Sequence, residues 1–163
     1  MQIKRLIVGS IETNCYFLIS GKEMVIIDPG GSPDLLLKEI EKTGIKPKYI
    51  INTHYHFDHV LANKRIQKKT KAEIIKLKEG DKVKIGDEEL EIISTPGHSK
   101  EDICLFGKDF VLTGDTLFKD GYGRTDLPGG SEEELRESLN RLDGLIRPGM
   151  KVYPGHGEIF EHS

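Results

Sequence analysis

Alternating and continuous hydrophobic runs along the chain predict short β-strands that come mostly in pairs. In the first thirty residues the runs Gln2–Val8, Asn14–Ser20 and Glu23–Asp28 each have this pattern, and Gly21 marks the turn between the last two. Glycine-containing turns also separate two later pairs of runs, which predicts two hairpins. The later strands are expected at Tyr49–Asn52, Ala72–Ile75, Lys82–Ile85, Glu88–Ser94, Ile103–Phe106, Phe110–Thr113 and Lys151–Tyr153.

Three segments have the hydrophobic period and the end signals of helices. Ser32 is a candidate N-cap with Pro33 in the first turn, and this helix is expected to run to Thr43 and to stop at Gly44. A second helix is expected from about Val60 to Thr70, and a third from the cap Ser131 to about Leu145. Hairpins with interspersed helices indicate a mixed α/β layered fold, and we expect one domain over residues 1–163.

Composition and charge limit the classes of protein that the chain can belong to. Apolar residues make up 36% and charged residues 31%, and the net charge is −3 with both signs interleaved. These values disfavour a disordered chain, a membrane protein and a dedicated nucleic-acid partner. The start of the chain lacks a secretion signal, and Cys15 and Cys104 lie in apolar runs as buried thiols would. We expect a cytoplasmic protein that is a monomer or a weak homo-oligomer.

The chemistry-bearing residues gather in loops that directly follow strand-like runs. Five of the six histidines fall in three such loops, and a fourth loop offers the carboxylate of Asp115 at the same position relative to its strand. Loops at the same ends of strands in one layered fold converge in space. The seven candidate donors are His54, His56, Asp58, His59, His98, Asp115 and His156.

Imidazoles and carboxylates in this number indicate a metal site with more than one ion. One tetrahedral zinc takes three or four donors, whereas seven donors suffice for two ions that share a carboxylate. Zinc is the first expectation, with iron or manganese as alternatives. The sixth histidine, His162, lies one residue from the end of the chain and is expected to be a solvated tail residue rather than a ligand.

The motifs as a set resemble those of the metallo-β-lactamase superfamily. They are His54-x-His56-x-Asp58-His59, Thr-Pro-Gly before His98, Gly-Asp115-Thr-Leu-Phe and Pro-Gly-His156-Gly. The stretch Gly123–Ser131 is similar to that of short glyoxalase II-like (hydroxyacylglutathione hydrolase-like) proteins, which lack the C-terminal helical domain of larger members. The resemblance implies an αββα sandwich with two mixed sheets and helices on the outer faces.

The resemblance also implies roles for individual residues. His54, His56 and His98 would hold one metal, Asp58, His59 and His156 the other, and Asp115 would bridge the two. Asp58 would in addition orient the attacking water. Asp28 matches a position that braces the metal loop, although a simple turn residue at a strand end is an equal alternative. Arg124 occupies a basic position that could meet a substrate carboxylate, or it could form a solvated or structural ion pair.

The activity that the resemblance implies is metal-dependent hydrolysis of a thioester such as S-lactoylglutathione by a hydroxide that bridges the metals. Two alternatives stay open. A mononuclear iron persulfide dioxygenase also has a Gly-Arg-Thr-Asp segment and would use only His54, His98 and Asp115. A metal-binding scaffold with little activity is the other, whereas the charge pattern disfavours a superfamily nuclease.

One departure from the family concerns the segment after Ile75. Relatives commonly carry several tens of residues between the strand that ends there and the segment Lys78–Asp81, whereas in this chain the two follow each other directly. The few residues of this link span only about 3.3 Å each, so they cannot form a cover. We therefore expect an open site with permissive hydrolysis and a high KM.

Overall fold

A computed structural model describes all residues, 1–163, and its contacts divide the chain into two compact units. Unit 1 comprises residues 1–76 and 83–89, and unit 2 comprises residues 77–82 and 90–163. The expectation of a single domain stays a prediction. No helix of the structure combines the length and the apolar character that crossing a bilayer requires.

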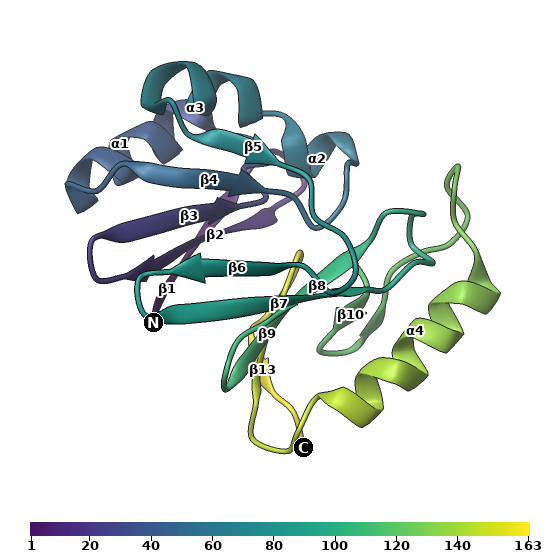
Figure 1. The fold of residues 1–163 in the computed structure, drawn as a ribbon. Coiled ribbons are helices and arrows are strands. Elements are labelled where there is room, and N and C mark those ends of the chain that lie inside the picture. The colour runs from purple at the N-terminus through teal and green to yellow at the C-terminus, as the bar shows by residue number, and fades with distance from the viewer. The chain divides into compact units, whose positions relative to one another are not determined.

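Unit 1 is built around a five-stranded mixed sheet with the order β1-β2-β3-β4-β5 (Figure 1). Strands β1 to β3 are antiparallel neighbours, whereas β3, β4 and β5 run parallel to one another. The bounds of the strands are β1 Gln2–Val8, β2 Thr13–Ser20, β3 Glu23–Ile27, β4 Pro47–Ile51 and β5 Glu73–Ile75.

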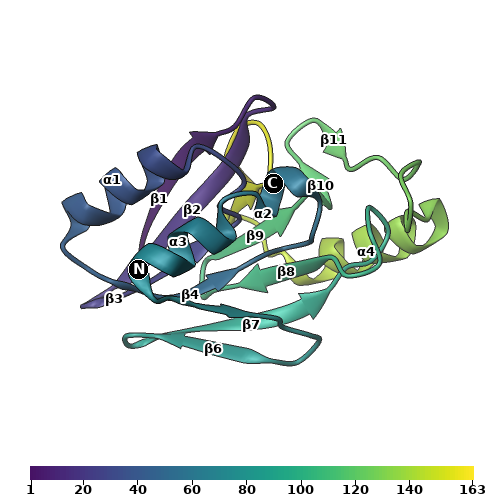
Figure 2. The ribbon, with the colours of Figure 1, turned by 90° about the horizontal axis from the view of Figure 1, so that it is seen from above.

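Helices α1 (Pro33–Thr43) and α3 (Asn63–Thr70) lie over the same face of this sheet, as the view from above shows (Figure 2). The core of unit 1 includes Phe17 and Ile26 of the sheet with Leu36 and Ile66 of the helices, all four fully buried. Sheet and helices thus hold the loops that follow β3 and β4 against a rigid base.

Unit 2 contains most of a six-stranded mixed sheet, with the order β13-β12-β9-β8-β7-β6, and a two-stranded ribbon of β10 and β11. Neighbours β9 and β12 run parallel, and β7, β8 and β9 pair antiparallel. The bounds are β6 Lys82–Ile85, β7 Glu88–Ser94, β8 Ile103–Phe106, β9 Phe110–Gly114, β10 Leu117–Phe118, β11 Gly121–Tyr122, β12 Lys151–Pro154 and β13 Phe160–Glu161.

Helix α4 (Glu132–Leu145) packs on the sheet of unit 2. Leu142 of α4 is buried in one cluster with Cys104, Val111 and Val152 of the strands. The helix begins as its sequence predicts, because the Ser131 side chain accepts a hydrogen bond from the Glu134 amide at 3.2 Å.

Two predicted helix features are wrong in detail. Ser32 does not cap α1 with its side chain; its hydroxyl instead accepts a hydrogen bond from the Gly9 amide at 3.1 Å. The helix expected from about Val60 begins only at Asn63, as α3, and a separate short helix, α2 (Phe57–Val60), precedes it. The two helices are interrupted because the Ala62 amide donates to the Pro29 carbonyl.

Candidate metal centre

Four of the seven candidate donors lie in one loop of unit 1, directly after β4. His54 and His56 point their rings edge to face at 4.8 Å between centroids, and a ligand atom of each lies within 4.8 Å of the other. Asp58 and His59 follow in α2, both buried. A backbone bond from the His59 amide to the His56 carbonyl at 2.9 Å closes this turn. The loop therefore folds so that its polar side chains gather.

A pair of asparagine side chains ties the metal loop to α3. Nδ2 of the Asn52 side chain donates to the His59 carbonyl at 2.9 Å and to Oδ1 of Asn63 at 3.3 Å. Nδ2 of Asn63 donates in return to Oδ1 of Asn52 at 2.7 Å. Because all three residues are buried, these bonds satisfy groups that would otherwise cost stability. The asparagines were not among the predicted site residues.

Asp28 connects three groups of the metal loop. Its carboxylate accepts hydrogen bonds from the Thr53 amide at 2.8 Å, from the Thr53 hydroxyl at 2.6 Å and from His59 Nδ1 at 2.9 Å. Asp28 itself is buried and has a positive φ of 52°. The simple turn-residue interpretation does not account for these three bonds, which place Asp28 directly behind the His59 ring.

These bonds determine which ring nitrogen of His54 and His59 carries the proton. A carboxylate only accepts, so His59 Nδ1 donates to Asp28. The Thr53 hydroxyl already donates to Asp28, so it accepts from His54 Nδ1 at 3.1 Å. Both rings therefore carry a proton on Nδ1, and in the neutral form of each ring the lone pair lies on Nε2. This is the tautomer that binds a metal through Nε2.

A close backbone approach explains one glycine of unit 1. A Cβ atom at Gly30 would lie 1.5 Å from the Asp58 carbonyl oxygen, so no other residue fits there.

The Asp58 side chain accepts a hydrogen bond from the Thr13 hydroxyl at 3.1 Å. Its Oδ2 also lies 3.2 Å from Nε2 of His59. The two atoms therefore lie close enough to bind one cation together.

The other three candidate donors lie in unit 2. Asp115 follows β9 and His156 follows β12, and the two loops are joined by a bond from the Gly155 amide to the Gly114 carbonyl at 2.7 Å. Because β9 and β12 are parallel neighbours, their ends meet at one edge of the sheet. Asp115 Oδ2 lies 3.5 Å from Nε2 of His156 and 3.5 Å from Nε2 of His98. The Asp115 carboxylate is thus placed between two imidazoles.

His98 has its proton placed by a backbone group. Its Nδ1 donates to the carbonyl of Arg124 at 2.7 Å, so Nε2 again bears the lone pair. The preceding Gly123 packs so tightly that an added Cβ would lie 1.9 Å from the Asp115 carbonyl oxygen and 2.9 Å from His98 Nδ1. The segment around Gly123 is therefore a wall behind both His98 and Asp115.

The guanidinium of Arg124 forms an ion pair within its own loop. Nε and Nη2 of Arg124 donate to the two carboxylate oxygens of Asp126 at 2.6 and 2.7 Å. This fork holds the pKa of Asp126 down at about 2. Of the two sequence interpretations, the structure displays the ion pair. The contact of the Arg124 carbonyl with His98 could not be foreseen, because every residue has a carbonyl.

A buried carboxylate closes the turn after His98. Asp102 accepts hydrogen bonds from the amide and the hydroxyl of Ser99, at 2.7 and 2.5 Å. Burial raises the pKa of Asp102 to about 6, although the bonds from Ser99 oppose that shift.

His162, the sixth histidine, belongs to none of the groups of potential metal ligands, and its backbone pairs with Gly149 and Met150.

The comparisons with known proteins agree with this donor chemistry. The family model described as the metallo-beta-lactamase superfamily matches residues 8–92 and 76–156. A probable metallo-hydrolase of Methanocaldococcus jannaschii is 38% identical over 179 residues, which cover 88% of this chain and 87% of that protein. The aligned length exceeds the 163 residues of this chain, so the relative carries residues that this chain lacks.

Two solved structures extend the likeness to the fold. The BLEG-1 B3 metallo-beta-lactamase superposes with a TM-score of 0.91 at 26% identity, over 98% of this chain and 94% of that one. The protein TTHA1623, solved in a di-iron-bound form, superposes with a TM-score of 0.89 at 28% identity, over 97% and 94% of the two chains. The predicted fold class, the metallo-β-lactamase type with two mixed sheets, is confirmed. This chain belongs to the metallo-β-lactamase superfamily.

Proposed function

We propose that the donor sets of the two units act together as a dinuclear metal centre that hydrolyses thioesters, with S-lactoylglutathione as the reference substrate. His54, His56 and His98 would hold one ion, Asp58, His59 and His156 the other, and Asp115 would lie between them. The hydrogen bonds of the imidazoles carry this proposal. His54, His59 and His98 each donate through Nδ1 to a different acceptor, so each presents an Nε2 lone pair.

The donor set suits the metals that hydrolases use. Neutral imidazole nitrogens with carboxylate oxygens are ligands for zinc, iron and manganese, and both cysteines are buried in the strands β2 and β8 rather than in the loops. Two such cations, when bound, make a water molecule more acidic and polarise a carbonyl group.

The residues of the chain contribute positioning and proton handling. Asp28, Thr53 and the Arg124 carbonyl keep the imidazoles in the tautomer that presents Nε2. The Asp58 carboxylate, held by the Thr13 hydroxyl, accepts a hydrogen bond from the attacking water and orients it. In the overall reaction a C–O bond forms, the C–S bond breaks, and the protons of water pass to the thiol and to the acid.

The test measures metal content and hydrolysis in the same samples. We expect about two zinc, iron or manganese ions per chain and hydrolysis of S-lactoylglutathione. Asp115→Ala should lower both the metal content and the rate, because its carboxylate lies against two imidazoles. His162→Ala is the matched control and should change neither. One iron per chain with oxygen uptake on a persulfide would favour the dioxygenase instead, and an Asp115→Ala protein that lost metal but kept full activity would contradict the proposal.

A further inference from the structure

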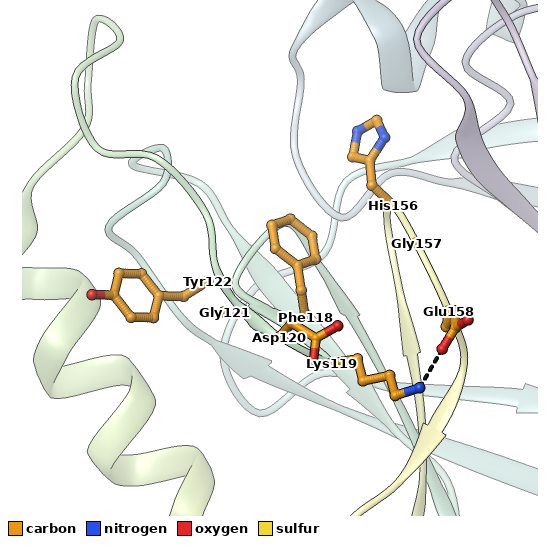
Figure 3. A pocket seen from close by; sticks show the side chains of 8 residues that line it. All are labelled: Phe118, Lys119, Asp120, Gly121, Tyr122, His156, Gly157 and Glu158. Atoms are coloured by element: carbon orange, nitrogen blue, oxygen red, sulfur yellow. Dashed lines mark hydrogen bonds and ion pairs between the residues drawn. The ribbon is translucent and has the colours of Figure 1, made fainter.

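A cavity of about 540 Å³ lies in unit 2 beside His156 (Figure 3). It is formed by the β10–β11 ribbon and the loop after β12, and all of its lining residues belong to this unit. A volume of this size is within the range of small-molecule sites. His156, a candidate metal ligand, therefore lies at one end of the cavity. The rest of the cavity can hold a substituent of the group that reacts at the metals.

The middle of the cavity is aromatic. The Phe118 ring lies edge to face with the His156 ring, with 6.4 Å between the ring centroids and an angle of 77° between their planes. Figure 3 shows the Lys119–Glu158 ion pair at the end of the cavity away from His156, with the Phe118 ring to one side, whereas the Tyr122 side chain points away from these residues. A group that extends from His156 into the cavity thus has the Phe118 ring beside it and charged side chains farther along.

The far end of the cavity has an excess of negative charge. Lys119 forms an ion pair with Glu158, and the carboxylates of Glu158 and Asp120 both raise the pKa of the Lys119 ammonium. Two carboxylates therefore share one ammonium, and these are the charged side chains of the lining. A phosphate at this end would meet no uncompensated cation, whereas an ammonium would meet carboxylates.

We propose that this cavity is the subsite for a substituent of the scissile thioester, and that it accepts a neutral or ammonium-bearing group and rejects a phosphorylated one. The inference rests on the proposed thioester hydrolysis and adds a substrate class to it. The neutral or ammonium-bearing substituent can be part of the thiol half or of the acyl half of the thioester. The experiments below distinguish these two cases.

The first experiment compares acetyl thioesters of three thiols with the zinc-loaded protein at low ionic strength, where charge effects are largest. The probes are acetylthiocholine, which is cationic, S-acetyl-N-acetylcysteamine, which is neutral, and acetyl-coenzyme A, which is polyanionic. We expect kcat/KM for the first two to exceed that for acetyl-coenzyme A at least tenfold. The acyl arm compares S-butanoyl- with S-succinyl-N-acetylcysteamine, and the half whose charge matters is the half that enters the cavity.

Variants then assign the discrimination to the cavity. Asp120→Asn and Glu158→Gln should each reduce the preference for acetylthiocholine over acetyl-coenzyme A several-fold, and Asp120→Asn leaves the Lys119–Glu158 ion pair in place. The matched control is Glu133→Gln, which removes the same charge from an exposed position in the first turn of α4. Equal kcat/KM values in both arms, for the three thiols and for the two acyl groups, or an equal effect of the control, would overturn the proposal.

A binding measurement keeps this inference separate from the proposed function. In ¹H–¹⁵N spectra, choline should shift the amide signals of Gly121 and Gly157, which line the cavity, and Asp120→Asn should weaken that binding several-fold. If no thioester is hydrolysed but choline shifts these signals, the proposed reaction fails and the selectivity of the cavity stands. If thioesters are hydrolysed and choline shifts neither amide, the cavity is not this subsite.

Discussion

At the scale of single residues, the centre depends on side chains that contact imidazoles and that need not contact the metals. Thr53 is the clearest case, because its hydroxyl donates to Asp28 and accepts from His54. Thr53→Val keeps the shape and removes both bonds. We expect metal affinity to fall about 10- to 100-fold, as measured by competition with a chromophoric chelator.

A matched control is available for the Thr53 variant. At the end of α3 the Thr70 hydroxyl donates to the Ile66 carbonyl at 2.8 Å and accepts from the Ala72 amide at 3.2 Å. Thr70→Val therefore loses two hydroxyl bonds, as Thr53→Val does, but neither bond involves a candidate donor, so its metal affinity should equal that of the unmodified protein. If the two variants lost the same affinity, the role of Thr53 would be general stability rather than orientation of His54.

Asp102 provides a prediction about pH. Its pKa in the folded protein is about 6, above the ordinary value of 3.8, so the folded state holds this proton more tightly than the unfolded state. The corresponding stability is present below about pH 4 and is lost as the pH rises through 6. The measurement is urea unfolding of chelator-treated protein. Between pH 4 and 7 the free energy of unfolding of Asp102→Asn should rise relative to that of the unmodified chain by on the order of 3 kcal/mol. A difference that does not change with pH would contradict this assignment.

At the scale of elements, the segment from β11 to α4 acts as a wall that aligns His98. Gly123→Ala places a methyl group against the backbone carbonyl of Asp115, which cannot move aside as a side chain could. We expect the segment to shift, the bond between His98 and the Arg124 carbonyl to break, and the hydrolysis rate to fall by about 100-fold. Circular dichroism should show that the fold is retained.

Gly144 in α4 provides a control for Gly123, because a methyl group added there has free space around it. No atom lies within 4 Å of a Cβ built at Gly144, so alanine meets nothing there. Because alanine is the better helix former, Gly144→Ala should stabilise the protein by about 0.5–1 kcal/mol without changing activity. Thermal denaturation checks the first expectation and a thioester assay the second. Similar losses of activity in both glycine variants would show that the wall at Gly123 is not the cause.

At the scale of the whole molecule, metal binding should appear as stability. Ions that bind the folded chain and not the unfolded one stabilise it by mass action, by about 2.7 kcal/mol per site at a free concentration 100-fold above Kd. For a chain of 163 residues this corresponds to about 5–10 °C in Tm. A chelator should therefore lower Tm, added zinc should restore it, and Asp115→Asn should weaken the response to zinc. An identical Tm with and without chelator would contradict a structural contribution of the ions.

The short link after β5 is also a property of the whole chain. Residues Lys78–Gly80 are exposed and lie where the contacts change from unit 1 to unit 2. The two family-model matches overlap at residues 76–92, so the alignment to the family is interrupted in this region. An exposed link of this kind tolerates insertion. Permissive hydrolysis with a high KM stays the prediction for a chain that lacks residues here.

The strands were more predictable from sequence than the contacts between loops. Strands β1, β6 and β7 have the predicted bounds, because their alternation is strong and glycine turns delimit two of them. Strands β10, β11 and β13 have two residues each, which is too short for any periodic pattern. The break before α3 depends on Pro29, more than thirty residues away, and no local pattern contains that information. The histidine motifs predicted candidate donors that the structure brings into groups, but they could not predict which groups accept hydrogen bonds from Nδ1 of the imidazoles.

The hydrogen bonds behind His54, His59 and His98 have a consequence for how the protein acquires its ions. The rings are oriented by Thr53, Asp28 and the Arg124 carbonyl, and none of these hydrogen bonds needs an ion in order to form. We therefore expect loading to need little rearrangement, and similar nitrogen–oxygen donor sets bind several first-row metals. Which metal the protein carries would accordingly follow the supply in the cell during and after synthesis, so that preparations from media with different metal contents would differ in composition while sharing one architecture.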